Sequence, residues 1–386
     1  MDFNLSEEQL MFRDLFRDFA EKEVAKVAEH TDQAEALPAE VLQKAAAQGF
    51  LGATFPEALG GAAMDQLTYC LLLEALARQC ASTAVSVAAH TSLAGLTILE
   101  AGSDAQKEAY LPRLAGGELG AFALTEPEAG SDTTALQTRA VLAGGGWHFD
   151  GVKSWVSNGG TAGVFVVFAA TDPARRQDGL SAFIVEKSAP YLVVGHREPT
   201  LGLRGLDVRT LYLEGGPLPE SALLGPLNGG WALAQRAQDR FKLALAAVSL
   251  GLAENALDLG LRFAVERKQF GTAIAQKGAI QTYLADCAAE IESVRHLVHH
   301  AAWLADQGQD YRRAATIAKY LGARVAKDTA NKMLQVHGGY GFSDEYAISR
   351  VYRDSRALKI MGGTDEVQRF LVAQDVLKEA GVTIQP

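Results

Sequence analysis

Two stretches of the chain, FALTEPEAGSD (Phe122–Asp132) and DGVKSWVSNGG (Asp150–Gly160), decide how the sequence is interpreted. Between them, apolar and polar residues alternate around the turn Ala143–Gly146, which predicts a β-hairpin. The first stretch is a hydroxyl-rich turn, and the second carries a tryptophan on a strand. Donor groups beside an indole suit a flat polar heterocycle, whereas the plain alternative is a hairpin with a core tryptophan.

The bulk composition is that of an acidic globular protein of 386 residues. This length exceeds what one hydrophobic core organises, so two or three structural units are expected. The formal charge of −10 argues against nonspecific nucleic-acid binding, which relies on basic patches. The cysteines show no metal or redox spacing, so we expect no metal site and reduced, buried thiols in a cytoplasmic protein. These cysteines are Cys70, Cys80 and Cys287.

The N-terminus carries no basic-then-apolar targeting segment, because Met1–Ser6 runs directly into a helix start. The most membrane-like stretch, Ala81–Leu99, is rich in Ala, Ser and Thr and contains His90. A buried helix explains this stretch better than a membrane span. We therefore expect no association with a membrane.

The hydrophobic period changes twice along the chain and divides it into three parts. Residues 1–119 follow the helical period and open with a capping-box pattern at Ser6–Gln9. Residues 120–226 follow the period of strands, which predicts a small β domain. Residues 227–386 return to long helical patterns with many small residues, which predict a four-helix bundle. The expected fold class is α+β and multidomain.

TEPEAGSD followed by WVSNGG is similar to the paired signature of the acyl-CoA dehydrogenase family of flavoproteins. The similarity continues in the family's order through ERKQFG (Glu266–Gly271), QVHGGYG (Gln335–Gly341) and GTDE (Gly363–Glu366). With the N-terminal helices it covers essentially the whole chain. The resemblance implies an N-terminal α domain, a middle β-barrel domain and a C-terminal four-helix bundle. It also implies FAD as cofactor and hydride transfer from the α,β bond of an acyl-CoA to the flavin.

The resemblance also assigns cofactor contacts. A flavin that accepts hydride needs donors along its polar edge and a face shielded from water. The contacts implied on the isoalloxazine side are Phe122, Leu124, Thr125, Trp155 and Ser157, and Ser131 is a further implied cofactor contact. Those implied for the rest of the dinucleotide are Arg267, Phe270, Gln335, Gly338, Gly339, Thr364 and Glu366. By itself Arg267 would be a solvated helix end, but in the family this block reaches the flavin of a neighbouring subunit. A homo-oligomer, typically a tetramer, is therefore expected.

The substrate side follows from the same resemblance. The positions that match contacts to the thioester, its carrier and the pocket are Ser131, Asp239, Lys242 and Arg204. Lys242 stands where arginine is common, so it keeps the charge but loses the bidentate fork. Gly278 stands where the family often has glutamine, so one cofactor hydrogen bond is expected to be absent. Electrons are expected to pass to an electron-transfer flavoprotein.

The sequence departs from the family at the catalytic base. α,β-Dehydrogenation needs a carboxylate that removes the α-proton while the β-hydrogen leaves as hydride. Most members carry this glutamate just before the Gly-Thr turn, where this sequence has Gly362. A minority carry it on the first bundle helix, where this sequence has Phe241. Asp239 is the nearest carboxylate in sequence, but on a helix it points about 200° away from Phe241. The catalytic residue stays unassigned.

Three interpretations of the missing glutamate remain open. In the first, a carboxylate from elsewhere, such as Asp239, acts as the base. In the second, the protein runs a different flavin reaction, as an oxidase or monooxygenase or on a substrate whose proton is already acidic. In the third, it is a flavin-binding partner subunit with little activity of its own. Phe241 and Gly362 together predict an apolar pocket floor, which suits substrate binding but not proton abstraction.

Overall fold

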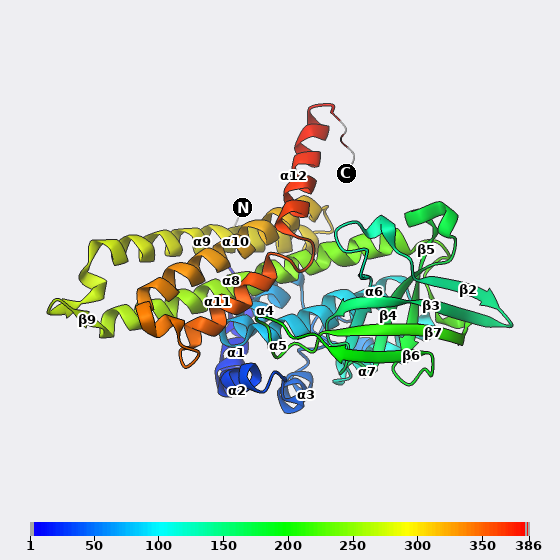
Figure 1. The fold of residues 1–386 in the computed structure, drawn as a ribbon, viewed down its shortest axis with the longest axis horizontal. Helices are drawn as coiled ribbons and strands as arrows, with labels where there is room; N and C mark the ends of the chain where they lie inside the picture. The colour runs from blue at the N-terminus through cyan, green and yellow to red at the C-terminus, as the bar shows by residue number, and fades with distance from the viewer. Residues whose placement is uncertain (1–3, 383, 385–386) are drawn as a thin grey trace.

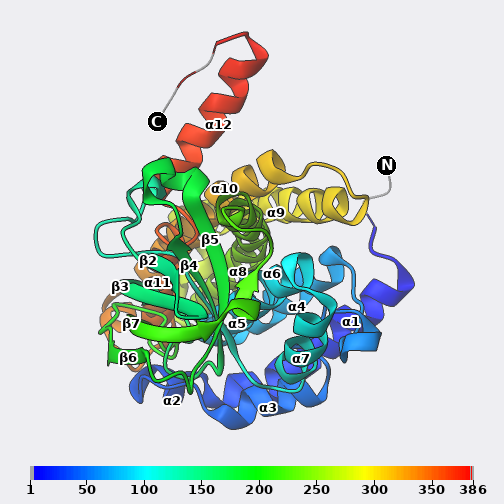
Figure 2. The same cartoon turned by 90° about the vertical axis from the view of Figure 1, so that its right-hand side faces the viewer.

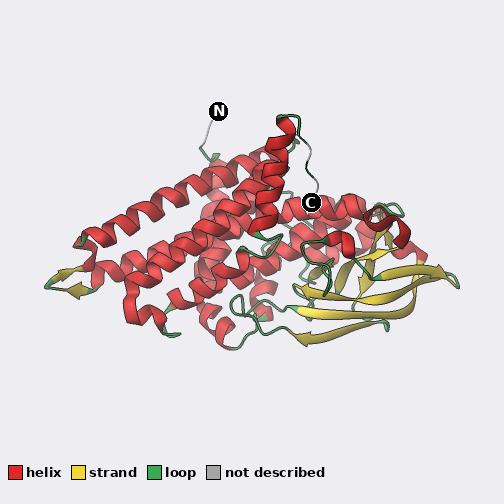
Figure 3. Cartoon of the chain, turned by 45° about the horizontal axis from the view of Figure 1, so that its top comes forward, coloured by secondary structure: helices red, strands yellow, loops and turns green. Residues whose placement is uncertain are grey.

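The computed structural model describes residues 4–382 and 384. Met1–Phe3, where the expectation of no targeting segment begins, lie outside the described residues. The described chain forms an N-terminal helical part, a middle β sheet and a C-terminal helical part (Figures 1 and 3). The sheet lies at one end of the long axis, and a short β-hairpin lies at the other (Figure 1). The sheet and the hairpin, which both carry predicted cofactor contacts, therefore lie at opposite ends of the molecule.

The N-terminal helices begin at the predicted capping box. The hydroxyl of Ser6 accepts from the Gln9 N–H at 3.1 Å, and the Gln9 side chain accepts from the Ser6 N–H at 3.0 Å. The helical path then becomes irregular, because a π-helical turn at Ala20–Val24 and a 3-10 turn at Ala25–Val27 separate α1 from α2. The helices are α1 (Glu7–Phe19), α2 (Ala28–Gln33), α3 (Ala39–Ala47), α4 (Gln66–Gln79), α5 (Ala81–Ala88), α6 (Leu96–Ala101) and α7 (Asp104–Ala115).

Among the described residues, two helical stretches are long and apolar enough to cross a membrane by length and composition alone. They are Ala81–Ala101 and Gly230–Glu266. The share of the apolar window that is buried inside the protein is 89% in the first and 78% in the second. Packing in the protein interior therefore explains their composition, as predicted for Ala81–Leu99. The predicted burial of the three cysteines is also confirmed.

The middle part is an eight-stranded sheet in the order β6-β7-β3-β2-β4-β5-β8, with β1 beside β4. The predicted hairpin is confirmed, because β2 and β3 pair antiparallel with Ala143 opposite Gly146. The predicted barrel is not confirmed, since the edge strands β6 and β8 do not pair in the described residues and β8 is too short to close the sheet. The strands are β1 (Gly120–Ala123), β2 (Arg139–Ala143), β3 (Gly146–Val156), β4 (Val164–Ala170), β5 (Leu180–Glu186), β6 (Leu192–Arg197), β7 (Arg209–Pro219) and β8 (Leu223–Leu224).

The long helix α8 is the centre of the C-terminal part and packs against α9, α10, α11 and the N-terminal α4. A hairpin of β9 and β10 joins α8 to α9. The last helix, α12, packs on α10 and projects from the body of the molecule (Figures 1 and 2). The elements are α8 (Gly230–Glu266), β9 (Lys268–Gln269), β10 (Thr272–Ala273), α9 (Gly278–Asp306), α10 (Arg312–His337), α11 (Ala347–Leu358) and α12 (Asp365–Glu379).

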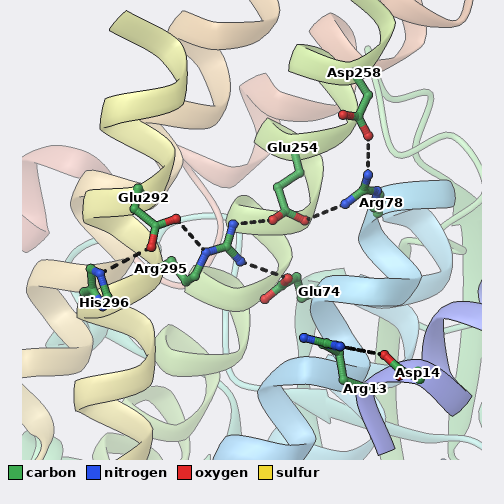
Figure 4. Close-up of polar contacts among 9 residues, drawn as sticks. All are labelled: Arg13, Asp14, Glu74, Arg78, Glu254, Asp258, Glu292, Arg295 and His296. Atoms are coloured by element: carbon green, nitrogen blue, oxygen red, sulfur yellow. Dashed lines mark hydrogen bonds and ion pairs between the residues drawn. The ribbon is translucent and has the colours of Figure 1, made fainter. Parts of the chain in front are cut away.

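A charged network joins α4, α8 and α9 in the interior (Figure 4). The guanidinium of Arg295 lies 3.2 Å from Glu74 and 2.5 Å from Glu254. Arg78 extends the network from Glu254, at 3.3 Å, to Asp258. The side chains of Glu74 and Glu254 are only 6% and 10% exposed. Burial raises the pKa of Glu74 to about 7. Each buried carboxylate therefore depends on its arginine partner.

Candidate functional site

Trp155 stands at a β-bulge in β3. Lys153 of β3 is opposite Leu211 of β7. The next aligned pair is Val156 opposite Arg209, so β3 contains one extra residue at this point. Trp155 has a φ of +58°, and 61% of its surface is exposed. A non-glycine residue in this region is strained, and a bulge beside a binding site re-aims a side chain. The bulge presents the indole outward, where a flat ring can stack on it.

The structure brings the two predicted flavin stretches into contact. The N–H of Ser154 donates to the carbonyl of Thr125 at 2.9 Å, which fixes Thr125 beside the bulge. Phe122 and Leu124 lie just before this turn and are buried. Ser131, at the far end of the turn, is exposed. The turn and the bulge therefore form one continuous structure.

Two charged residues that sequence analysis missed lie at this junction. The ammonium of Lys153 donates to the carboxylate of Glu126 at 2.6 Å, and both side chains are buried. A signal was present, because each is a charged residue inside one of the two decisive stretches. Buried charges of opposite sign need each other, so this pair belongs to the structure that supports the site.

Ser157 follows the bulge and is half-buried. Its neighbour Asn158, also missed by the sequence analysis, has a φ of +61°. The amide of Asn158 donates to the carbonyl of Ser86 at 3.0 Å and accepts from the Ser86 hydroxyl at 2.8 Å. Nearby, the N–H of Gly120 donates to Nδ1 of His90 at 2.9 Å. These bonds tie both flavin stretches to the N-terminal helices.

Some of the predicted contacts to the rest of the dinucleotide lie where α8 and α10 end, whereas Thr364 and Glu366 lie at the start of α12. Arg267, Gly338 and Gly339 line one cavity of about 640 Å³. The guanidinium of Arg267 lies over the ring of Tyr340, 5.3 Å from its centroid. A Cβ built on Gly338 or Gly339 would meet no atom within 4 Å, so the backbone there is open to a ligand. Phe270 lies at the tip of the β9–β10 hairpin next to this cavity, and it is 95% exposed.

The structure does not bring the two groups of contacts together within one chain. The hairpin that begins after Arg267 lies at the end of the molecule opposite the β sheet (Figure 1). The sheet carries Trp155 and Ser157. Gln335 is exposed near the end of α10 and is not among the residues that line the cavity. Within one chain, the ring contacts on the sheet and the cavity beside Arg267 therefore lie at different ends.

The Gly-Thr turn is held by buried donors. The ammonium of Lys319 donates to the carbonyl of Gly363 at 2.6 Å, and Gln368 donates to the same carbonyl at 3.1 Å. Burial lowers the pKa of Lys319 to about 8. Thr364 caps α12 with its hydroxyl, and Glu366 is exposed in the first turn of that helix. The turn is therefore fixed before any cofactor binds.

The two positions at which the family resemblance would place the base face each other. A Cβ built on Gly362 would lie 2.7 Å from Cδ1 of Leu245 and 3.4 Å from Cδ1 of Phe241. Phe241 is 3% exposed. Gly362 has a φ of +66°, a region that strains other residues. The wall at this point is apolar, and neither position supplies a carboxylate.

Asp239 already has a partner on its own helix. Its carboxylate accepts from the ammonium of Lys242 at 2.8 Å, and the two side chains are 15% and 9% exposed. Both residues stand on α8 close to Phe241 in sequence, but the carboxylate of Asp239 points to the ammonium of Lys242. The role of Asp239 as a base therefore stays a prediction.

Arg204 lies in the loop between β6 and β7. The N–H of Leu203 donates to Asp354 at 2.5 Å, and the N–H of Gly205 donates to Ser82 at 3.2 Å, so the loop is fixed on both sides. The Nε of Arg204 is buried and has no hydrogen-bond partner among the described residues. Arg204, the predicted pocket contact, thus has an N–H donor at Nε that is available to a ligand. Gly278, where the family often has glutamine, is the exposed first residue of α9.

The comparisons with known proteins cover nearly all of the chain. The N-terminal, middle and C-terminal domain models of acyl-CoA dehydrogenase match residues 6–118, 121–215 and 228–377. A short-chain specific acyl-CoA dehydrogenase of Clostridium acetobutylicum is 38% identical over 98% of this chain and 100% of that protein. A solved structure described as the electron transferring flavoprotein of Acidaminococcus fermentans has a TM-score of 0.96 and 37% identity, covering 98% of this chain and 100% of that one. A structure of PigA with FAD and proline has a TM-score of 0.94 and 29% identity, covering 98% and 100%.

The residues on both ends fit FAD. The exposed indole of Trp155 suits one face of the isoalloxazine ring. The guanidinium of Arg267 offers a planar fork for a pyrophosphate, beside a cavity with open glycine backbone. These features agree with the domain matches along the full length. The chain belongs to the acyl-CoA dehydrogenase family, and it is an FAD-dependent oxidoreductase that acts on CH–CH bonds.

Proposed function

We propose that the protein dehydrogenates a short-chain acyl-CoA thioester and passes the electrons to an electron-transfer flavoprotein. The observation that carries this proposal is the presented indole of Trp155 joined to the donor-rich turn at Thr125. Bound FAD supplies the hydride acceptor. The indole and the turn exclude water from one side of that acceptor and orient it. The names of the short-chain and electron-transferring relatives support the choice of substrate and partner.

The acyl group is proposed to pack near Gly362, where the wall is apolar. Phe241 and Leu245 fill the space beside this glycine, which favours a small acyl chain. Lys242 and its partner Asp239 are proposed to bind the thioester carrier, because a buried ammonium offers several donors to its amides and phosphates. Ser131 and Arg204 would contact the same arm.

A second candidate function follows from the missing base. Neither Phe241 nor Gly362 can take up the α-proton, so an unactivated acyl chain is expected to react slowly. We therefore also propose activity on acyl thioesters whose α-proton is acidified by a neighbouring group. Such substrates need less help from a protein carboxylate, and the remaining apolar wall binds them.

An anaerobic titration of the yellow protein tests both candidates. Butyryl-CoA and longer saturated acyl-CoAs are added in turn while the flavin absorbance is followed, and a 3-thia-acyl-CoA serves as a non-oxidisable analogue with an acidified α-proton. Bleaching by butyryl-CoA supports the first candidate. A long-wavelength charge-transfer band with the 3-thia compound, without bleaching by saturated compounds, supports the second. Protein that retains no FAD, or fast reoxidation by air, contradicts the dehydrogenase proposal.

A homo-oligomer is proposed to complete the FAD site, with a tetramer as the expected form. The β9–β10 hairpin, which follows Arg267 and contains Phe270 at its tip, lies at the opposite end of the chain from the sheet that carries Trp155 (Figure 1), so a second copy would bring its own hairpin to the flavin. The exposed ring of Phe270 and the projecting helix α12 leave surface for such contacts. Analytical ultracentrifugation tests this assembly. A monomer that binds FAD at full affinity would contradict it.

Arg267→Ala is expected to lower FAD affinity by about 10- to 100-fold, because hydrogen bonds to a charged group contribute about 1.5–3 kcal/mol. The measurement is fluorescence titration of the apoprotein with FAD. Arg262→Ala is the matched control, since Arg262 is an exposed arginine in the last turns of α8, just before Arg267, and does not line the cavity. Equal losses in the two variants would show a general charge effect.

A further inference from the structure

The ion pair of Glu126 and Lys153 lies at the flavin-contacting turn but takes no part in binding or hydride transfer as described. Lys153 is fully buried, and Glu126 is 5% exposed. Moving two charges out of water is unfavourable, and a packed apolar pair is often as stable. Burial lowers the pKa of Lys153 to about 8, against the attraction of Glu126. The presence of charges here therefore points to a role other than the stability of the sheet.

The pair joins three segments of backbone. The Lys153 ammonium donates to the carbonyl of Leu124 at 3.1 Å as well as to Glu126. The Glu126 carboxylate accepts from the N–H groups of Gln137 at 2.6 Å and Thr138 at 3.0 Å. Strand β3, the turn after β1 and the segment before β2 therefore meet on two side chains. Apolar side chains could not bind these backbone groups.

What the pair holds in place is a strained backbone. Trp155, two residues after Lys153, has a φ of +58° in the bulge of β3. Such a conformation persists only where its surroundings impose it. The Ser154 N–H bond to Thr125 adds a second link between the same segments. Without the Lys153 link, β3 is free to relax towards a regular strand, which would turn the indole away from the ring position.

We infer that Glu126 and Lys153 are positioning residues that hold the turn at Thr125 and the bulge at Trp155 in the FAD-binding geometry before FAD arrives. The inference rests on the proposed contact of the flavin ring with these two residues. When only a fraction of the protein is in the binding-competent form, the apparent dissociation constant rises by the inverse of that fraction. Breaking the pair therefore weakens FAD binding without removing any atom that touches FAD.

The test compares Lys153→Met with the double variant Glu126→Gln/Lys153→Met. FAD affinity of the apoprotein, from fluorescence titration, is expected to fall by about 10- to 100-fold in both. Apoprotein stability, from urea unfolding, is expected to drop in the single variant and largely recover in the double variant, because Glu126 no longer carries an unpaired buried charge. The flavin absorption band of the loaded variants is expected to shift, since the indole no longer lies against the ring.

If the pair served only stability, FAD affinity would recover together with apoprotein stability in the double variant. Recovery of both would therefore overturn the inference. Glu126→Asp covers the case in which the larger changes prevent folding. It keeps the charge but shortens the reach, and unchanged FAD affinity there would equally contradict the inference. Arg78→Met is the matched control, because it breaks ion pairs between α4 and α8 outside the sheet. Wild-type protein that binds no FAD would instead overturn the proposed function itself.

Discussion

Phe241→Glu is expected to raise the rate at which saturated acyl-CoAs bleach the flavin by about 10²- to 10⁴-fold, the usual contribution of a positioned general base. The wild-type ring of Phe241 lies on α8 beside Gly362, and neither residue can accept a proton. A carboxylate at position 241 would stand where a minority of the family carries theirs. Stopped-flow absorbance under anaerobic conditions measures the effect with butyryl-CoA.

Phe241→Gln is the control, because it has the same shape as the glutamate variant but cannot take up a proton. Burial raises the pKa of a carboxyl group in an apolar site, so the gain should grow as the pH is raised above neutral. Equal rates in the glutamate and glutamine variants would contradict the role of a missing base. Gly362→Glu should give a smaller gain, because the φ of +66° at this position is a backbone conformation that strains a side chain.

Arg295→Met is expected to destabilise the protein by about 3 kcal/mol or more, because it leaves Glu74 and Glu254 buried without their shared cation. The measurement is the urea unfolding transition followed by circular dichroism. Folding raises the pKa of Glu74 from 4.5 to about 7, so its stabilising contribution is present at low pH and lost as the pH rises through this window. Arg295 opposes this rise in the pKa of Glu74, because it stabilises the ionised carboxylate. The deficit of the variant should therefore be larger at pH 8, where Glu74 is ionised in the wild type, than at pH 5.

Arg113→Met is the control for this prediction. Arg113 binds Glu118 and Glu186 at 2.7 and 2.8 Å, but its side chain is 40% exposed. Exposed ion pairs contribute about 0–1 kcal/mol, so this variant should unfold close to the wild type at both pH values. Similar deficits in the two variants would show that burial is not what makes the Arg295 network important.

Local patterns predicted the elements that depend on neighbouring residues. The capping box at Ser6 and the hairpin turn at Ala143–Gly146 are set by side chains and glycines within a few positions, and both are present. The barrel could not be judged in this way, because closure depends on whether β6 and β8 meet, and no short-range pattern specifies that contact. Sequence analysis thus predicted the strands but not the outline of the sheet.

In the candidate site too, features that follow from a motif were predicted, and features that depend on distant contacts were not. The glycines at 338 and 339 were identified through the family motif, and the cavity beside Arg267 fits that assignment. The bulge at Trp155 could not be predicted, because it exists only relative to the register of β7. The apolar floor at Phe241 and Gly362 was predicted through the family resemblance and is present, although no short-range pattern joins α8 to a turn so far along the chain. Lys153 supports the site without touching the ligand, and its only signal in the sequence is a charge inside one of the two decisive stretches.

The separation of Arg267 from Trp155 has a genetic consequence under the proposed assembly. Each FAD would draw its ring contacts from one copy and its pyrophosphate contact from another, so a defect at either end damages a different half of the site. In a mixed dimer of one Arg267 variant and one Trp155 variant, both lesions fall on one FAD and the other FAD meets only intact residues. Two defective alleles would therefore complement each other when they are produced together. The distance between the two ends of one chain (Figure 1) would then be detectable in a genetic cross.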